Sequence, residues 1–368
     1  MTLSYKDKED VALILKQHPK ASFDKCFKAS QNNLLFCDNI IGLKTLLYDY
    51  DMKGKIDLVY IDPPFATNTK FKIGTNRVST ISSSKDDALA YSDTLTGYEF
   101  IEFLRKRLIL LKELLSDEGS IYLHIDYKIG HYVKIVMDEI FGIENFKNDI
   151  TRIKCNPKNF NRKAYGNIKD LILFYTKTNK AIWNEIKEPY TDEDIARLYK
   201  KIDNNNRRYT TIPLHAPGET LNGNTSQEWK GLHPPKGRHW RSSPAELDKL
   251  EEQGLIEWSS TGNPRKIIYA DEKDGKKRQD IWIFKDTQKP VYPTEKNIDM
   301  LDNIIKTSSN KDSIILDCFS GGGGTLYAAE QHGRKWIGID NSKESIKVIT
   351  KRFNEVDKDF NLMKCKEH

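Results

Sequence analysis

The stretch that most constrains the fold is a short apolar segment that ends in two consecutive prolines. Residues 56–61 form a largely apolar run that is typical of a buried strand. Pro63 and Pro64 follow almost at once, and the strand must end there because proline cannot extend a ladder of backbone hydrogen bonds. The carboxylate of Asp62 is thereby placed at the carboxyl end of the strand, which is where open α/β sheets bind their ligands.

The turn after this strand carries groups that suit a nucleobase. Asp62 offers only acceptors, the carbonyl of Pro63 offers another, and a proline has no N–H that could compete with them. Phe65 adds an aromatic face. Acceptors beside a stacking ring suit a flat ring that carries an amino donor, as a base with an exocyclic amine does. A strand that simply ends in a Pro-Pro turn with a solvated aspartate is the structural alternative.

Apolar runs alternate with helical periodicity over much of the chain. Residues 121–125 and 171–175 predict further strands, and residues 100–115 and 133–141 carry apolar side chains at helical spacing. Gly119 is expected to end the first of these helices. Strands separated by helices indicate parallel βα units, so we predict an α/β fold with a doubly wound, mostly parallel sheet.

Composition excludes several other classes of protein. The chain has 368 residues, of which 38% are hydrophobic and 30% charged, and its formal net charge is +6. No apolar run approaches the roughly 20 residues of a membrane span, and residues 1–7 lack the apolar core of a signal peptide. Five scattered cysteines without a C-x-x-C pair indicate neither a zinc site nor a disulfide framework. We therefore expect a cytoplasmic location, no membrane contact and no metal.

A glycine-rich turn follows a second buried strand near the carboxyl end of the chain. Residues 313–317 form this strand, and residues 318–324 form a tight loop that leads into a helix. A turn of this kind lets backbone N–H groups approach a nucleotide-like ligand. Asp340 ends the next strand, and an acidic residue about 20 positions after such a turn suits a ribose diol.

The glycine loop lacks the features of a dinucleotide or phosphate site. If Gly321 and Gly323 are the first two glycines of the dinucleotide fingerprint, the third position is Leu326. No Gly-Lys-Ser/Thr sequence supports phosphate binding. A ribose-holding acid without phosphate machinery suits S-adenosylmethionine better than a nicotinamide dinucleotide. A nicotinamide oxidoreductase would explain the glycine loop but not the turn at residues 62–65.

Periodicity disappears from about residue 177 to residue 289, where Pro, Gly, Asn, Trp and basic residues accumulate. The clearest part is residues 229–241, with four Lys or Arg residues, two Trp and no acid. Interleaved cations and aromatic rings can hold phosphates and stack on bases, whereas an irregular solvated surface is the alternative. The candidate nucleic-acid contacts are Lys230, Lys236, Arg238, Trp240 and Arg241.

These motifs, in this order, resemble those of the amino-methylating DNA methyltransferases of the permuted β-class. Residues 62–65 match the family's D/N/S-P-P-aromatic signature, and residues 317–323 resemble its D-P-F-x-G-x-G loop. Residues 37–39 look like its G-D-N segment, and residues 292–296 look like its P-T-x-K-P segment. Residues 119–126 resemble a further sheet motif of the family. The sequence departs from the pattern at three positions, Cys318, Asn297 and Gly324, where the family usually has Pro, Pro and Thr.

The resemblance implies a site-specific enzyme that moves a methyl group from S-adenosylmethionine to an exocyclic amine of a base flipped out of double-stranded DNA. N6 of adenine is the expected acceptor, because the motif of N4-cytosine enzymes begins more often with Ser. N4 of cytosine is one alternative, and a non-catalytic DNA-binding specificity protein is another. The implied catalytic residues are Asp62, Pro63, Pro64 and Phe65, and the implied cofactor residues are Asp38, Lys296, Asp317, Phe319, Gly321, Gly323 and Asp340.

The resemblance also divides the chain into three parts. Residues 1–176 would hold the catalytic motif, residues 177–289 the target recognition region, and residues 290–368 the half that binds S-adenosylmethionine. A homodimer and a cognate restriction endonuclease are further partners that the resemblance allows. Neither a metal nor a nucleophilic cysteine is expected, because the methyl acceptor is nitrogen rather than carbon.

Overall fold

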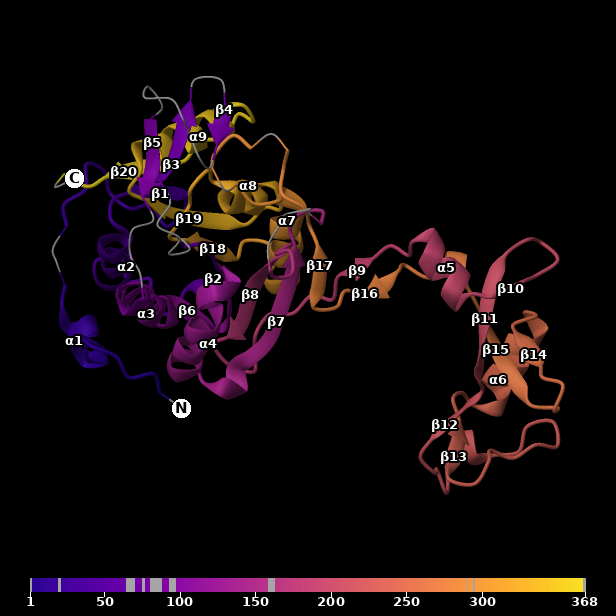
Figure 1. The fold of residues 1–368 in the computed structure, drawn as a ribbon. Helices are drawn as coiled ribbons and strands as arrows, with labels where there is room; N and C mark the ends of the chain where they lie inside the picture. Colours follow the sequence, from indigo (N-terminus) through magenta and orange to yellow (C-terminus); the bar gives the residue numbers. More distant parts are fainter. Residues whose placement is uncertain are drawn as a thin grey trace. The chain divides into compact units, whose positions relative to one another are not determined.

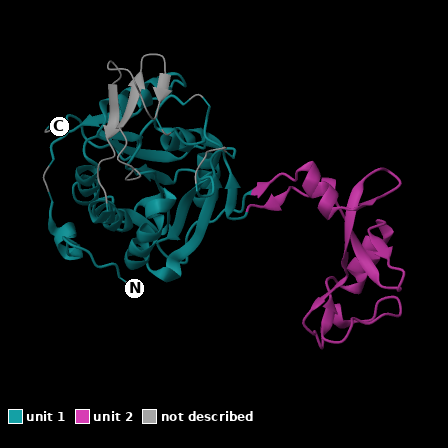
Figure 2. Cartoon of the chain, viewed as in Figure 1, with its two compact units in different colours: residues 1–186, 279–368 teal, residues 187–278 magenta. Residues whose placement is uncertain are grey.

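The fold was determined as a computed structural model that divides into two compact units. Residues 1–186 and 279–368 form the larger unit, and residues 187–278 form the smaller unit (Figure 2). The smaller unit lies within the stretch 177–289 that the sequence sets apart. The structure describes residues 2–18, 21–63, 70–74, 77–79, 88–92, 97–157, 163–288, 290–293 and 295–366, and of the strands at 70–74, 77–79 and 88–92 it describes the backbone only.

Nine strands of the described residues form one sheet in the larger unit, in the order β17-β7-β8-β6-β2-β18-β19-β1-β20 (Figure 1). Every neighbouring pair is parallel except the two pairs that involve β8. The strands are β1 (Asn33–Phe36), β2 (Ile56–Ile61), β6 (Leu115–Ile125), β7 (Phe146–Ile153), β8 (Lys169–Thr176), β17 (Ile281–Ile283), β18 (Ile314–Asp317), β19 (Lys335–Asp340) and β20 (Asn361–Lys364). A separate sheet contains β3 (Lys70–Gly74), β4 (Arg77–Ser79) and β5 (Ala88–Ser92).

Helices cover both faces of the nine-stranded sheet, which confirms the predicted doubly wound α/β fold (Figure 1). In β2 the alternate residues Val59 and Ile61 face one hydrophobic core, whereas Leu58 and Tyr60 face the other. The first core contains side chains of α1 (Val11–Lys16), α2 (Asn39–Tyr48), α3 (Gly97–Leu114) and α4 (Tyr127–Phe141). The second contains side chains of α7 (Ile298–Ser308), α8 (Gly324–Gln331) and α9 (Lys343–Asn354). In the described part of the chain, none of the helices has both the length and the apolar character needed to cross a membrane.

The smaller unit is built from short elements around a small core of its own. That core contains Leu214, Trp229, Trp240 and Leu247. Its strands are β9 (Lys187–Glu188), β10 (Lys201–Ile202), β11 (Arg208–Pro213), β12 (His215–Pro217), β13 (Arg238–Trp240), β14 (Ile256–Trp258), β15 (Pro264–Tyr269) and β16 (Lys276–Lys277), and its helices are α5 (Asp192–Leu198) and α6 (Pro244–Glu252). Short 3₁₀ turns occur at Ile143–Asn145 (η1) in the larger unit, and at Asn224–Ser226 (η2) and Ala270–Glu272 (η3) in the smaller one.

Candidate active site

The carboxyl ends of four neighbouring parallel strands bring four predicted site residues to one edge of the sheet. Asp62 follows β2, Asp317 ends β18, Asp340 ends β19 and Asp38 follows β1. The register brings these positions within a few residues of one another along the strands, since Leu316 pairs with Val59, Asp317 pairs with Gly338, and Phe36 pairs with Asp340. The turn at the front of the chain and the glycine loop near its end therefore share this edge, where parallel sheets bind ligands.

The two oxygens of the Asp62 carboxylate have different surroundings. Oδ2 forms an ion pair with the ammonium of Lys296. Oδ1 is buried, and no donor among the described residues reaches it. A buried acceptor is unfavourable without a donor, and a ligand with an N–H or O–H group could supply one to Oδ1. Pro63 is buried beside it. The predicted residues Pro64 and Phe65 lie outside the described residues.

The glycine loop depends on glycine at specific positions. Gly323 has φ +73°, and a Cβ there would lie 2.7 Å from Cγ1 of Ile349 in α9. Gly321 also has a positive φ, +50°, and its N–H donates to Oδ2 of Asp340 (2.8 Å). A Cβ on Gly322 would lie 2.7 Å from Cβ of Tyr292, so the segment before α7 packs directly on the loop.

Two of the carboxylates at this edge, those of Asp317 and Asp340, have raised pKa values. Burial raises the pKa of Asp317 to about 7, and the negative charges of Asp62 and Asp340 contribute to the increase. Burial likewise raises the pKa of Asp340 to about 6, even though backbone N–H groups of Ser342 and Gly321 donate to its carboxylate. A cationic ligand would lower both values, so the electrostatics of this edge favour a cation over an anion.

The start of α2 is tied to the glycine loop. Asp38 caps α2 by accepting from the N–H of Ile40 (2.8 Å), and it lies 3.5 Å from Nη2 of Arg107. Nδ2 of Asn39 donates to the carbonyl of Cys318 (2.9 Å). Phe319 is half-buried, and its ring centroid lies 6.1 Å from that of Phe103. Asp38 and Phe319 are thus both placed at the shared edge.

Arg107 and Asn39 were not among the site residues predicted from the sequence, although Asn39 lies in the segment that resembles G-D-N. Arg107 is buried, Nε donates to Oδ1 of Asn39, and its guanidinium lies 3.5 Å from the ring centroid of Phe103. Burial lowers the pKa of Arg107 to about 10. Its position in the sequence could have predicted that Arg107 is buried, because residue 107 falls on the apolar helix face that Leu104, Leu108 and Leu111 define.

A buried polar row, here named the His124 row, extends from Asp62 across the sheet. His124 occupies the position on β6 opposite Asp62, one step beyond the pair Ile61–Leu123. Its Nδ1 lies 2.9 Å from Oη of Tyr60 and its Nε2 lies 3.2 Å from Oδ2 of Asp170, which also pairs with Arg152 (3.4 Å). Burial lowers the pKa of His124, so the imidazole is neutral near pH 7. The described residues contain no group of three or more His, Cys, Asp or Glu that could hold a metal ion.

The predicted nucleic-acid contacts of the smaller unit have mixed placements. Lys236, Arg238 and Arg241 are exposed, and Lys230 forms an ion pair with Glu251. Trp240 is only 2% exposed, and its Nε1 donates to the carbonyl of Gln227 (2.9 Å). The structure therefore corrects the role given to Trp240, because an indole in the core of the unit is not available to stack on a base.

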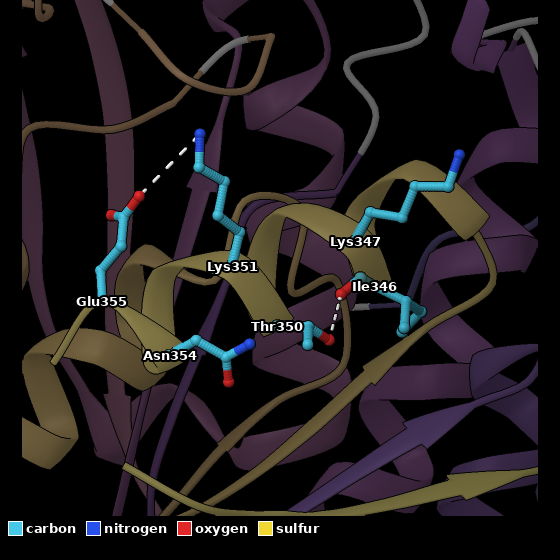
Figure 3. Close-up of a pocket in the computed structure, with 6 residues that line it drawn as sticks. All are labelled: Ile346, Lys347, Thr350, Lys351, Asn354 and Glu355. Carbon is cyan, nitrogen blue, oxygen red and sulfur yellow. Dashed lines mark hydrogen bonds and ion pairs between the residues drawn. The ribbon is translucent and has the colours of Figure 1, made fainter. Parts of the chain in front are cut away.

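A surface hollow lies on the outer side of α9 in the larger unit (Figure 3). The opposite side of this helix carries Ile349, which supports the glycine loop. The hydroxyl of Thr350 is directed back to the carbonyl of Ile346 (2.7 Å), as Figure 3 shows. The residues that line the hollow are Ile346, Lys347, Thr350, Lys351, Asn354 and Glu355. None of them is a predicted site residue, so the hollow plays no part in the candidate active site.

Comparisons with known proteins agree with the geometry. The DNA methylase family N6_N4_Mtase matches residues 56–351. The type II methyltransferase M.EcaI of Enterobacter cloacae is 38% identical over 366 residues, which cover 96% of this chain and 77% of that protein. The StyLTI Mod subunit of a type III restriction-modification enzyme of Salmonella typhimurium is 26% identical over 338 residues, which cover 82% of this chain but 50% of the subunit. The structure of an M1.HpyAVI–SAM complex aligns with a TM-score of 0.45 at 16% identity, covering 87% of this chain and 99% of that one.

The fold and the site define the class of this protein. It is an α/β enzyme in which the acid-proline turn and the glycine loop share one edge of the sheet. The family match and the identity to M.EcaI show that the chain belongs to the N6/N4 DNA methylase family, the S-adenosylmethionine-dependent DNA methyltransferases of the restriction-modification type.

Proposed function

We propose that this DNA methyltransferase transfers a methyl group from S-adenosylmethionine to N6 of adenine, at a specific site in double-stranded DNA. The observation that supports this most directly is the buried Oδ1 of Asp62, an acceptor that no donor among the described residues reaches, on the edge shared with the glycine loop. An exocyclic amine would bring a donor to Oδ1. Because such an amine is enclosed in the base stack, the base must be flipped out to reach Asp62. Aspartate as the first residue of the motif favours adenine over cytosine.

The chain's part in the reaction is to bind, orient and polarise. We infer that Oδ1 of Asp62 accepts one N–H of the amine and the carbonyl of Pro63 accepts the other. With both hydrogens held from one side, the lone pair of the nitrogen is directed away from the acceptors. When bound, S-adenosylmethionine supplies an electrophilic methyl group on its sulfonium sulfur. Fixing the nitrogen in line with that group would provide much of the rate, since well-aligned reactants avoid a large loss of entropy.

The residues at the shared edge fit S-adenosylmethionine. The cofactor carries positive charge on its sulfonium and its ammonium, and Asp317 and Asp340 have raised pKa values that a cation would lower. We assign the ribose to Asp340, the adenine to Asp38, and the surrounding cradle to Phe319 and the glycine loop. These assignments come from the family resemblance and agree with the placement of the residues.

We propose that the smaller unit binds the DNA around the target site. Arg238, Arg241 and Arg265 face His215, whose pKa is held below its ordinary value by burial and then by these three charges. None of the ion pairs among the described residues involves these three arginines, whereas Arg207 of the same unit pairs with Asp271 and Glu272. The exposed guanidinium groups of Arg238 and Arg241 suit a phosphate backbone. A cytoplasmic location, a homodimer and a cognate endonuclease remain predictions.

Incubation with labelled S-adenosylmethionine and unmodified genomic DNA, followed by nucleoside analysis, tests the proposal. We expect label in N6-methyladenine and none after Asp62→Ala, with cofactor affinity of that variant within about threefold of the unchanged protein. Asp359→Ala, which removes an exposed aspartate of the same unit, is the matched control and should methylate normally. Label in N4-methylcytosine alone would show that the methyl acceptor is cytosine rather than adenine. Full activity of Asp62→Ala would refute the catalytic assignment.

A further inference from the structure

We propose that Lys296 is a positioning residue for Asp62, holding Oδ2 so that Oδ1 remains available to the incoming amine. The family resemblance gives Lys296 a role in cofactor binding, whereas in the structure its ammonium forms an ion pair with the carboxylate of Asp62. The inference rests on the proposed function, because it assigns a role within the same site.

Both neighbours of Lys296 are anchored, which fixes where its side chain begins. Glu295 pairs with Arg352 of α9 and accepts from the N–H of Val291 (2.8 Å). Asn297 caps α7 by accepting from the N–H of Met300 (3.1 Å), and its Nδ2 donates to the carbonyl of Lys285 (2.9 Å). An anchored backbone on each side is what a residue needs if it is to hold another group precisely.

Residue 297 departs from the family pattern, which usually has proline there. A proline would pre-set the backbone for the start of a helix, and the asparagine achieves a comparable result through its side chain. The same segment packs on the glycine loop through Tyr292. Tyr292 and Lys296 therefore connect the glycine loop with Asp62.

The ion pair leaves the two carboxylate oxygens unequal. The side chain of Lys296 is 9% exposed and that of Asp62 18% exposed, so their attraction is screened little by solvent. A single ammonium bound to one oxygen restricts rotation of the carboxylate about its last bond. Oδ1 is then held in a fixed direction before the base enters, and the entropy of ordering it does not have to be lost during the reaction.

Among the described residues, Lys296 is the ion-pair partner of Asp62. Other titratable groups that the structure describes near Asp62 include Asp317 of β18, Tyr60 of β2 and His124 of β6. Burial lowers the pKa of His124, so its neutral imidazole supplies no positive charge that could replace the ammonium. Lys296 is therefore the described residue that can fix the orientation of the carboxylate.

The experiment compares Lys296→Met, Lys296→Gln and Lys296→Arg in steady-state methylation of a DNA substrate that the unchanged protein modifies. We expect Lys296→Met and Lys296→Gln to lower kcat about 10- to 100-fold, the scale of a misplaced reacting group. Their affinity for S-adenosylmethionine, measured by calorimetry, should stay within about threefold. Lys296→Arg keeps a cation at this position and should recover part of kcat.

Lys347→Met is the matched control, because this lysine lies on the outer face of α9 and pairs only with Glu344 among the described residues. Unchanged kcat in Lys296→Met and Lys296→Gln would overturn the inference. So would a loss of cofactor affinity that accounts for the whole loss of activity, with no recovery of kcat in Lys296→Arg. If Lys296→Met does not fold, Lys296→Gln and Lys296→Arg decide the matter by the same criteria. Failure of the unchanged protein to methylate adenine would instead refute the proposed function.

Discussion

Replacing Asp317 with asparagine should stabilise the cofactor-free protein, and more strongly at higher pH. Burial, and then the charges of Asp62 and Asp340, raise the pKa of Asp317 to about 7 from an ordinary value of 3.8. A raised pKa means that the folded protein holds this proton more tightly than the unfolded chain does. The contribution of the carboxyl group to stability is therefore fully present below pH 3.8 and is lost as the pH rises to about 7. Asparagine has no proton to lose at this position.

The size of the effect follows from the interval between the two pKa values. Each pH unit within the interval changes the free energy of unfolding by about 1.4 kcal/mol, which gives about 4 kcal/mol over the whole interval. Between pH 5 and pH 8 the difference between variant and unchanged protein should grow by about 3 kcal/mol. Asparagine keeps an oxygen that can accept from the N–H of Phe319 (2.9 Å), so the loop geometry should survive.

Denaturation by urea at pH 5, 6, 7 and 8, without cofactor, measures this difference. Other groups titrate in the same range in both proteins, so the difference between the two curves reports Asp317 together with its electrostatic coupling to Asp340. Asp359→Asn, at an exposed position of the same unit, is the control and should follow the unchanged protein at every pH. Parallel stability curves for Asp317→Asn and the unchanged protein would show that the carboxyl is not held protonated in the folded state.

Three further predictions concern the loop, the DNA surface and the His124 row. Gly323→Ala should lower the free energy of unfolding by about 2 kcal/mol, because φ is +73° and the added methyl group would crowd α9. A denaturation midpoint equal to that of the unchanged protein would contradict this prediction. Arg238→Gln should reduce the slope of log affinity for DNA against log salt concentration by about 1. Arg207→Gln, which breaks an internal ion pair, should leave that slope unchanged. Equal slopes for Arg238→Gln and the unchanged protein would exclude the phosphate contact. Arg152→Met should destabilise the protein by about 3–5 kcal/mol, since it leaves a buried carboxylate with a weaker set of partners, and a thermal melt within a degree of the original would refute that reasoning.

The sequence predicts the sheet and its helices well where hydrophobic patterns are long, but it cannot give strand direction or exact boundaries. Residues 171–175 form the predicted strand, yet β8 runs antiparallel to both of its neighbours. Gly119 was expected to end the helix that covers residues 100–115. Instead β6 begins at Leu115, where it pairs with Ile56. A Cβ on Gly119 would lie 2.9 Å from the carbonyl oxygen of Ile56, so the glycine permits a close approach of strands rather than capping a helix.

The acids of the candidate site are predictable for a physical reason, whereas their partners are not. An acidic residue directly after an apolar run must lie at a strand end, and parallel strands bring such ends to one edge. The pairing of Asp62 with Lys296, 234 positions later, depends on how the bridging segment returns to the sheet. Trp240 shows the same limit, because a ring beside cations in sequence can equally be the core of a small unit.

The charge at the shared edge also decides between the two cofactor classes that a glycine loop allows. A nicotinamide dinucleotide would bring a doubly negative pyrophosphate to the loop and would need free N–H groups there. The N–H of Gly321 already donates to the carboxylate of Asp340, and Asp317 lies at the end of the adjacent strand with its pKa raised to about 7. A second pair of negative charges would raise the free energy of this edge further, whereas a sulfonium and an ammonium would lower it. The same carboxylates that are unfavourable in the free protein therefore become favourable when a cationic cofactor binds, which predicts that its affinity rises as the pH is raised from 6 to 8.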